Sequence, residues 1–306
     1  MNNMRGIITG STGFVVKNLL NNDYFSKNHY FNIISRSTPI FNISTFENCR
    51  FVLHFAGKAH DLKNISSPNL YYEVNTELTK KLYDLFLDSE SEVFIMLSSV
   101  KAVSDLLLGE LTEDVIPNPI THYGKSKHLA EQYILNRGIP KGKRVYILRP
   151  CMIHGPGNKG NLNLLYKIVS KGLPWPLGAF ENKRSFCSID NLCFIINELI
   201  ENDQIPSGVY NIADDYPLST NELINLISES QNKNSHIWNV PKSLINTFAK
   251  IGDIFKLPLN SERLVKLTES YIVSNNKIKN AINKPFPLSS REGLKKTLNS
   301  FKIDAQ

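Results

Sequence analysis

The stretch RGIITGSTGFVVKNLL, residues 5–20, decides the fold. Residues 5–9 form a short apolar run that predicts a β-strand, and a helix is predicted directly after Gly13. A glycine-containing turn between a strand and a helix lets backbone N–H groups and the positive helix end face a pyrophosphate. An ordinary tight turn at Gly10 is the alternative. The third glycine of this pattern would stand at position 16, where Val16 predicts looser helix–strand packing.

A second strand, residues 30–35, leads to the position where a dinucleotide-binding fold contacts the ribose of its ligand. An acidic residue at this position would accept a hydrogen bond from the 2′-hydroxyl of NAD. Ser35 and Arg36 instead offer a hydroxyl and a cation that suit a 2′-phosphate. The sequence therefore predicts NADP, with NAD as the alternative, unless Arg36 is a solvated surface residue.

The crossover that follows, residues 37–50, is shorter than usual. It predicts that fewer residues line the adenine side of the cofactor pocket. Residues 39–43 could form a stub strand, and residues 44–47 have capping-box spacing for one helical turn. Residues 51–57 are nearly all apolar, as expected of a strand in a parallel sheet covered on both faces. His60 follows at the carboxyl end, where such sheets bind ligands, although a solvent-facing loop histidine is the commoner case.

The stretch THYGKSKHLAE, residues 121–131, carries the strongest candidates for chemistry. Tyr123 and Lys127 are spaced so that they share one face of a helix. A free tyrosine has a pKa near ~10, and a neighbouring ammonium favours the phenolate and lowers that pKa. The buried strand predicted at residues 93–98 delivers Ser99 to the same sheet edge, where its hydroxyl could hold a substrate oxygen. Each signal alone also occurs by chance on amphipathic helices and at strand ends.

The order of these features is specific. A glycine turn, an apolar strand with Ala-Gly, a strand with Ser-Ser, a Tyr-x-x-x-Lys helix and the Leu-Arg-Pro strand at residues 145–150 follow one another. The chain resembles the extended short-chain dehydrogenase/reductase family, specifically its NAD(P)-dependent nucleotide-sugar epimerase/dehydratase members, over nearly its whole length. The resemblance implies an α/β fold, a Rossmann-type doubly wound parallel sheet with a smaller, mostly helical substrate domain. Residues 1–155, with a returning strand near 208–213, would form the dinucleotide-binding domain, and residues 156–306 the interleaved substrate-binding region.

The resemblance also assigns roles. Tyr123 would exchange the proton of the C4 hydroxyl, Ser99 would share that hydrogen bond, and Lys127 would hold the nicotinamide ribose. The substrate would be bound by four residues, of which Asn161 and Arg184 would grip the pyrophosphate: Lys101, Asn161, Arg184 and Arg263. The cofactor would be contacted by Gly10, Ser11, Thr12, Gly13, Phe14, Val15, Arg36, Phe55, Ala56, Gly57, Asn75, Ser98, Tyr123, Lys127, Pro150 and Ile153.

Three functions remain open at this point. Family dehydratases place an acidic pair after the serine or threonine, and Val100 and Lys101 stand there, so elimination of water is disfavoured. Reduction of a 4-keto sugar and 4-epimerisation of a UDP-hexose of the glucose or GlcNAc type need the same side chains. We favour reduction, because Val16, the trimmed segment 37–50 and Arg36 indicate weaker cofactor retention and a phosphate-bearing hydride source. A non-catalytic dinucleotide-binding module is the third reading.

Several helices are predicted outside these motifs. Residues 70–88 read as a helix whose apolar stripe carries Asn75, and a buried amide needs partners, so it could brace the catalytic helix or a loop. Asp190 and Asn191 are good caps and predict a helix start. Residues 219–222 have capping-box character before a helix at 221–230.

Composition limits the partners. With 306 residues, 42% hydrophobic and 21% charged, the chain is large enough for a sizeable core. No apolar run approaches the ~20 residues of a membrane span and no signal peptide is seen, so we expect a cytoplasmic protein with no membrane partner. The net charge of +7 is spread along the chain, which argues against nucleic acid and is compatible with a ligand carrying several phosphates. The expected partner is a nucleoside-diphosphate sugar, a UDP-sugar first, used for surface polysaccharide precursors, and a homodimer is one assembly to consider.

The four cysteines show no C-x-x-C spacing, which supports neither a zinc site nor a disulfide framework. We therefore expect no metal, and we expect buried free thiols. The cysteines are Cys49, Cys151, Cys187 and Cys193.

Overall fold

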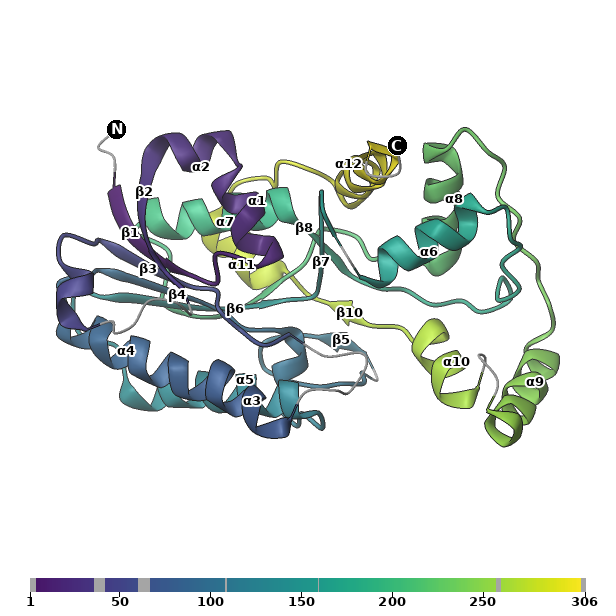
Figure 1. Ribbon diagram of the computed structural model, residues 1–306, viewed down its shortest axis with the longest axis horizontal. Coiled ribbons are helices and arrows are strands. Elements are labelled where there is room, and N and C mark those ends of the chain that lie inside the picture. The colour runs from purple at the N-terminus through teal and green to yellow at the C-terminus, as the bar shows by residue number, and fades with distance from the viewer. Residues whose placement is uncertain are drawn as a thin grey trace.

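Six parallel strands form the central sheet, in the order β2-β1-β3-β4-β6-β9 (Figure 1). The computed structural model describes residues 4–35, 42–59, 67–107, 109–158, 160–256 and 260–303. The six strands are β1 (Met4–Thr9), β2 (His29–Ile34), β3 (Phe51–His54), β4 (Val93–Leu97), β6 (Arg144–Pro150) and β9 (Gly208–Ile212). The predicted strands and fold class are confirmed, except that the predicted strand at residues 51–57 ends at His54.

Helices cover both faces of this sheet, because neighbouring strand residues point to opposite sides. Ile8, Leu53 and Ile95 pack into one core, and the adjacent Ile7 and Val52 pack into the other. One face carries α1 (Phe14–Leu20), α2 (Asp23–Asn28), α7 (Ile189–Glu201) and α11 (Asn276–Ile282) (Figure 1). The opposite face carries the 3₁₀ turn η1 (Ile43–Phe46), α3 (Pro68–Tyr72), the π-helical segment η2 (Glu73–Glu77), α4 (Leu78–Asp88) and α5 (His122–Arg137).

A second group of elements packs beyond the carboxyl ends of the strands, around two smaller apolar clusters (Figure 1). Its helices are α6 (Asn161–Ser170), α8 (Thr220–Ser230), α9 (Lys242–Phe255), α10 (Ser261–Thr268) and α12 (Ser290–Ile303). Short elements join the two parts: η3 (Val100–Ala102), the parallel pair β5 (Glu110–Leu111) and β10 (Ile272–Val273), and the parallel pair β7 (Met152–His154) and β8 (Phe186–Ser188). None of the helices in the described part of the chain is both long and apolar enough to cross a bilayer.

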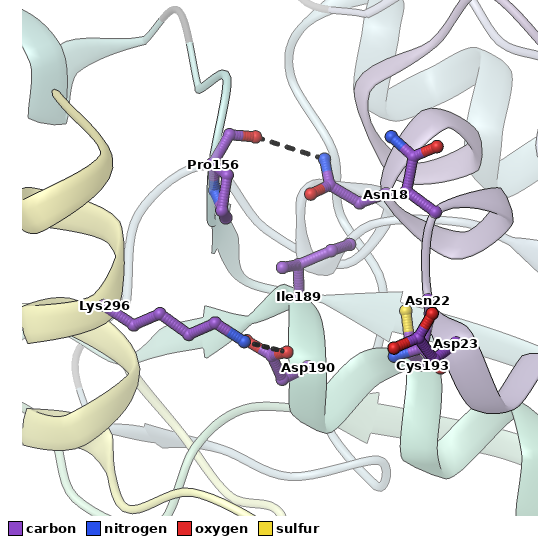
Figure 2. Close-up of a pocket in the computed structure, with 9 residues that line it drawn as sticks. Asn18, Asn22, Asp23, Pro156, Ile189, Asp190, Cys193 and Lys296 are labelled. Carbon is purple, nitrogen blue, oxygen red and sulfur yellow. Dashed lines mark hydrogen bonds and ion pairs between the residues drawn. The ribbon is translucent and has the colours of Figure 1, made fainter. Parts of the chain in front are cut away.

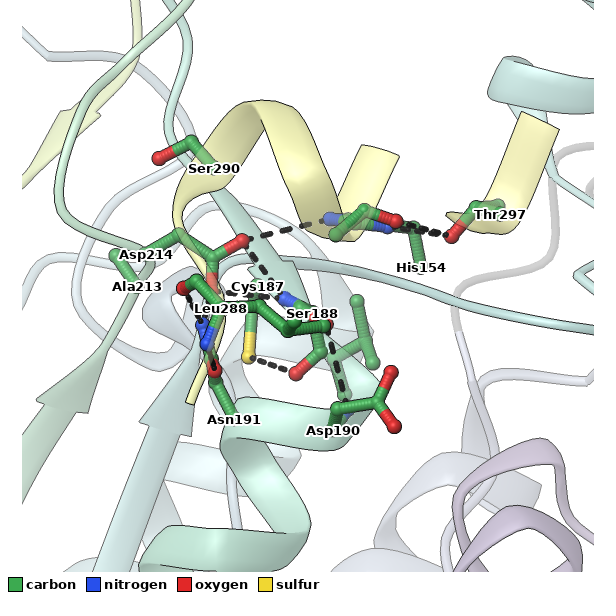
Figure 3. Close-up of polar contacts among 12 residues, drawn as sticks. His154, Cys187, Ser188, Asp190, Asn191, Ala213, Asp214, Leu288, Ser290 and Thr297 are labelled. Carbon is green, nitrogen blue, oxygen red and sulfur yellow. Dashed lines mark hydrogen bonds and ion pairs between the residues drawn. The ribbon is translucent and has the colours of Figure 1, made fainter. Parts of the chain in front are cut away.

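A buried polar network fastens the C-terminal helix α12 to β7 and β8 (Figure 3). His154 is fully buried, with Nδ1 2.9 Å from Thr297 Oγ1 and Nε2 3.5 Å from Asp214 Oδ2. The Asp214 carboxylate also accepts hydrogen bonds from the Ser188 backbone N–H and from Asn191 Nδ2. This network ties together segments that are far apart in the sequence.

The local helix-start predictions are partly right. The capping box at residues 219–222 is confirmed. Helix α7 begins at Ile189, and its cap is Ser188, whose Oγ accepts from the Asp190 N–H at 3.3 Å, so the prediction of an Asp or Asn cap is wrong by two or three residues. The helical turn predicted at residues 44–47 exists as η1, but Asn42 and Thr45 form its capping box. The stub strand predicted at 39–43 lies largely outside the described residues.

Candidate functional site

The glycine turn after β1 lies at the sheet position where the strand order reverses, which is where open α/β sheets bind ligands. Gly10 has φ +83°, and a Cβ there would lie 2.7 Å from the Ala56 nitrogen, so only glycine fits. The Gly13 N–H donates to the Gly10 carbonyl at 2.8 Å and starts α1. Thr9 Oγ1 accepts from the Ala56 N–H at 3.0 Å and joins the ends of β1 and β3. Val16 is 1% exposed within the core beside this turn.

A buried histidine that the sequence analysis did not assign connects this turn to α4. His54 Nδ1 lies 2.9 Å from Thr9 Oγ1, and its Nε2 lies 2.8 Å from Thr79 Oγ1. Burial lowers the pKa of His54 to about 3, so the ring is neutral at physiological pH. Thr79 Oγ1 donates to the Asn75 carbonyl at 2.7 Å. The chain of contacts therefore runs from the glycine turn to the π-helical segment.

Asn75 lies in that segment and has the partners predicted for a buried amide. Its Nδ2 donates to the Lys58 carbonyl at 3.1 Å and to Ser126 Oγ at 2.9 Å, and its Oδ1 accepts from the Lys58 N–H at 2.8 Å. The expectation that Asn75 braces a loop or the catalytic helix is met on both counts, because Lys58 is on the loop and Ser126 is on α5. The helix predicted over residues 70–88 contains a π-turn here, a feature that is frequent at functional sites.

Three predicted catalytic side chains lie together where α5 meets the ends of β3 and β4. Tyr123 and Lys127 are one turn apart on α5, and Ser99 hydrogen-bonds with Tyr123. Lys127 is 5% exposed, and its Nζ donates to the Leu97 carbonyl at 2.8 Å. A Cβ on Gly57 would lie 3.0 Å from Lys127 Nζ, so the missing side chain keeps the space beside the ammonium open.

Burial controls the protonation of this group. It raises the pKa of Tyr123, and the hydrogen bond with Ser99 opposes that rise only in part. It also lowers the pKa of Lys127 to about 8, against the opposing charge of Glu131. The pKa of Tyr123 in the polypeptide alone therefore lies above its ordinary value and not below it, because loss of water around the phenol destabilises its anion.

Gly124 sets how closely α5 approaches η3, the turn that follows Ser99. A Cβ at Gly124 would lie 2.4 Å from the Lys101 carbonyl oxygen and 2.9 Å from Pro119 Cβ. Thr121 Oγ1 caps the helix by accepting from the Gly124 N–H at 3.1 Å. The glycine after Tyr123 is thus required for the contact that places Tyr123 next to Ser99.

A buried ion pair behind the catalytic group was not predicted. Glu131 and Arg149 have side chains 1% and 5% exposed, and Arg149 Nη2 lies 2.6 Å from Glu131 Oε2. Arg149 Nε makes a second contact to the same carboxylate, and Ser98 Oγ donates to it with a short hydrogen bond. Of the two neighbouring serines, Ser98 therefore binds Glu131 and Ser99 binds Tyr123. The available signal was Glu131 on the same helix face as Lys127, one turn further along.

On the predicted substrate side, Lys101 and Arg184 have different partners but influence one another electrostatically. Lys101 Nζ donates to the Asp105 carbonyl at 2.9 Å and lies 4.2 Å from the centroid of the Tyr271 ring. Arg184 Nη2 lies 3.2 Å from Glu269 Oε1. Burial lowers the pKa of Lys101, the charges of Asp105 and Glu269 raise it, and the Arg184 charge lowers it further. These residues form one connected electrostatic group.

The remaining predicted residues are placed as follows. Asn161 is exposed at the start of α6, and Arg263 is exposed on α10, whose last turn leads to Glu269. Arg36 and His60 lie outside the described residues, so their roles stay predictions. The other predicted cofactor residues lie at or beyond the ends of β1, β3, β4 and β6: Ser11, Thr12, Phe14, Val15, Phe55, Ala56, Gly57, Ser98, Pro150 and Ile153.

A cavity of about 560 Å³ lies away from this group, between α1, α7 and α12 (Figure 2). Asn18 Nδ2 donates to the Pro156 carbonyl at 3.2 Å on one side, and Lys296 Nζ pairs with Asp190 at 2.6 Å on the other. None of the residues that line it is a predicted site residue. Among the described residues, no group of three or more His, Cys, Asp or Glu side chains could hold a metal ion, and all four cysteines are buried and free, as expected for the thiols.

The chain is similar to known proteins over most of its length. The family model described as the NAD dependent epimerase/dehydratase family matches residues 7–213. A Vibrio cholerae UDP-glucose 4-epimerase is 32% identical, over 96% of this chain and 94% of that protein. An Escherichia coli O157:H7 N-acetyl-alpha-D-glucosaminyl-diphospho-ditrans,octacis-undecaprenol 4-epimerase is 30% identical, over 59% of this chain and 55% of that protein.

Solved structures agree on the fold. The structure of UDP-glucuronic acid 4-epimerase from Bacillus cereus in complex with NAD has a TM-score of 0.76 at 16% identity, over 99% of this chain and 100% of that one. The matched residues 7–213 include the glycine turn, Ser99, Tyr123 and Lys127. The chain therefore belongs to the NAD-dependent epimerase/dehydratase family and is an NAD(P)-dependent nucleotide-sugar enzyme of the extended short-chain dehydrogenase/reductase type.

Proposed function

We propose that this enzyme is a 4-epimerase of a nucleoside-diphosphate hexose, with a UDP-sugar first among the candidates. The observation that carries the proposal is the Ser99–Tyr123 hydrogen bond beside buried Lys127, on a chain that matches a 4-epimerase over 96% of its length. Such an activity would supply precursors for surface polysaccharides. We also propose that residues 1–155 with the returning strand, and residues 156–306, act as the cofactor and substrate regions.

The site fits a nicotinamide dinucleotide. Gly10 leaves no room for a side chain at the turn where a pyrophosphate would lie, and Gly57 keeps the space beside Lys127 Nζ open. Lys127 would donate to the nicotinamide ribose, with its position fixed by the Leu97 carbonyl. When bound, the cofactor supplies the hydride acceptor and donor for C4.

Tyr123 would take the proton of the C4 hydroxyl and return it to the same oxygen after the sugar has turned its other face. Ser99 would share that hydrogen bond and hold the oxygen during both transfers. Because burial raises the pKa of Tyr123, the phenol needs a further positive charge beside it before it can act as a base at neutral pH. A nicotinamide that carries a positive charge would provide it, so proton transfer would be coupled to the cofactor's oxidised form.

The substrate diphosphate would lie against Lys101 and Arg184. An arginine–phosphate contact is charge-assisted, and Arg184 is already oriented by Glu269. Val100 is buried, and Lys101 is held by the Asp105 carbonyl, so this turn offers no acid where family dehydratases carry theirs. The buried Val100 and the engaged Lys101 therefore support a reaction that eliminates no water from the sugar.

Reduction of a 4-keto sugar, which the sequence alone favours, is the second candidate. The observation behind it is Ser35-Arg36, which suits NADPH and therefore an external hydride source. The Val16 argument for weak cofactor retention is of little weight, since this side chain is buried in the core beside the turn. The NADP preference itself remains a proposal.

The deciding experiment is to purify the protein without added cofactor and incubate it with UDP-glucose, UDP-GlcNAc and their 4-keto-6-deoxy relatives. Interconversion of C4 epimers without consumption of external NAD(P)H is the expected result. Consumption of NADPH with reduction of a 4-keto sugar, and no epimer interconversion, would replace the proposal with the reductase.

A further inference from the structure

Helix α9 is attached to the protein by a narrow face. Of its fourteen residues, only Ile245, Ala249 and Gly252 are buried. They recur at helical spacing, and Ile245 and Ala249 pack with Trp175, Leu177, Ile224 and Leu264. Most of the helix surface is therefore exposed.

The exposed surface carries a second apolar stripe, which we name the α9 ridge. Leu244, Phe248, Ile251 and Phe255 follow a four-three-four spacing and so share one helix face, and Ile254 flanks them. Phe248, Ile254 and Phe255 are 54%, 75% and 70% exposed. Single exposed apolar residues are normal, but five on one short helix form a contiguous patch that marks an interaction site.

The charges around the ridge favour an anionic partner. Between residues 242 and 268 the sequence has five basic and two acidic side chains. Both acids and one of the bases are engaged locally: Asp253 accepts from Ser261, and Glu262 pairs with Lys266 at 2.6 Å. Three of the other basic side chains, Lys242, Lys250 and Lys256, belong to α9 and its C-cap. A second copy of this chain would bring the same positive charges against the ridge. An anionic bilayer would not.

Helix α9 lies at the end of the molecule farthest from β2 (Figure 1). A flat surface could therefore meet the ridge without first meeting the Rossmann sheet. The expectation of no membrane partner rests on the lack of a segment long enough to span a bilayer. A helix that lies in the bilayer interface has no such length requirement, and it is recognised by an apolar face with aromatic residues and by lysines elsewhere on its surface.

We propose that the α9 ridge docks this enzyme on an anionic lipid surface. Phe248, Phe255 and the aliphatic residues of the ridge enter the headgroup boundary, and Lys250 and Lys256 add attraction to anionic headgroups. Helix α10 packs against α9 and leads to Glu269, the partner of Arg184. Resting on the proposed function, docking would bring the residues proposed to bind the substrate diphosphate, Lys101 and Arg184, close to the membrane surface.

The test is flotation of the full-length protein with vesicles of phosphatidylethanolamine and phosphatidylglycerol, compared with vesicles of phosphatidylcholine alone. The wild type is expected to float with the anionic vesicles, and the double variant Phe248→Ser/Phe255→Ser to lose at least tenfold in vesicle partitioning. The matched control is Tyr216→Ser, which removes an aromatic side chain that is 72% exposed outside α9 and should bind like the wild type. Lys250→Gln/Lys256→Gln should bind more weakly and less salt-dependently.

Absence of wild-type flotation, or an equal loss in Tyr216→Ser, would overturn the proposal. So would a wild-type dimer in sedimentation velocity that the ridge variant converts to monomer, because the ridge would then bind a second copy. Thermal unfolding checks that the variants are folded. Turnover of a UDP-sugar free in solution should be unchanged in the ridge variant, so failure of docking and failure of the proposed reaction give different results.

Discussion

The Glu131–Arg149 pair should be the most sensitive polar contact behind the site. Arg149→Met removes the guanidinium and leaves the Glu131 carboxylate, 1% exposed, with Ser98, His128 and the charge of Lys127 as its remaining polar surroundings. Breaking one side of a buried ion pair costs roughly 3–5 kcal/mol, because an uncompensated charge stays buried. For a chain of 306 residues this corresponds to a fall in Tm of about 5–8 °C.

The assay is thermal unfolding followed by circular dichroism at neutral pH, on two further variants. The double variant Glu131→Gln/Arg149→Met removes both charges of the pair and should recover more than half of the lost Tm, since the Glu131 carboxylate no longer stays buried without its guanidinium. Recovery should not be complete, because the buried Lys127 ammonium loses the opposing charge of Glu131. Arg50→Met is the matched control, because Arg50 and Glu92 form a 2.8 Å pair with side chains 44% and 49% exposed. That exposed pair should contribute about 0–1 kcal/mol.

The pH dependence provides an independent check. Burial alone would raise the pKa of Glu131, but hydrogen bonds from His128, Arg149 and Ser98 and the Arg149 charge hold it below its ordinary value. A carboxyl with a depressed folded pKa stabilises the protein above its unfolded pKa, and that stability is lost as the pH falls through the folded pKa. The difference in Tm between wild type and the double variant should therefore shrink on acidification below about pH 4. An Arg149→Met loss no larger than that of Arg50→Met, or equal losses in the single and double variants, would refute the reasoning.

Four further predictions concern the site. Tyr123→Phe should abolish turnover and leave the Tm within about 2 °C, because it deletes one hydroxyl and little volume. Turnover by this variant within tenfold of the wild type would rule out the assignment of Tyr123. Lys127→Met should weaken both cofactor binding and the rate of turnover. Arg36→Ala, titrated with NADPH and NADH, should change the affinity ratio by ~10- to 100-fold if the guanidinium meets a 2′-phosphate, since a charge-assisted contact contributes roughly 1.5–3 kcal/mol; an unchanged ratio makes it a surface residue. Gly124→Ala should lower kcat, because the added methyl group would lie 2.4 Å from the Lys101 carbonyl oxygen and force α5 away from Ser99. The control is Gly109→Ala, which should leave kcat unchanged because Gly109 is exposed and has open space where the methyl group would lie.

Much of the Rossmann half could be predicted because its signals are local. The strands alternate between two cores, and the glycine turn needs a residue that tolerates φ +83° and the close approach of Ala56. Tyr123 and Lys127 could be paired from helical spacing alone. These features depend on residues that are near one another in the chain.

The parts that could not be predicted depend on contacts between distant segments. His54 joins β1 to α4, and Glu131 is contacted by Ser98, directly after β4, and by Arg149 of β6. The π-turn around Asn75 leaves no mark in the sequence pattern. The residues around it keep the apolar stripe of an ordinary α-helix, so the sequence does not distinguish the two. The rise in the pKa of Tyr123 could not be predicted either, since it depends on how much water the packed structure excludes from the phenol.

The central claim is that the hydride leaves C4 of the sugar and returns to it within one active site. The direct measurement uses the UDP-hexose found to be the substrate, carrying deuterium at C4, with enzyme purified without added cofactor. Mass spectrometry and proton NMR of the C4 epimer should show the deuterium fully retained at C4. Loss of the deuterium to solvent, or no epimer without added NAD(P)H, would contradict the account.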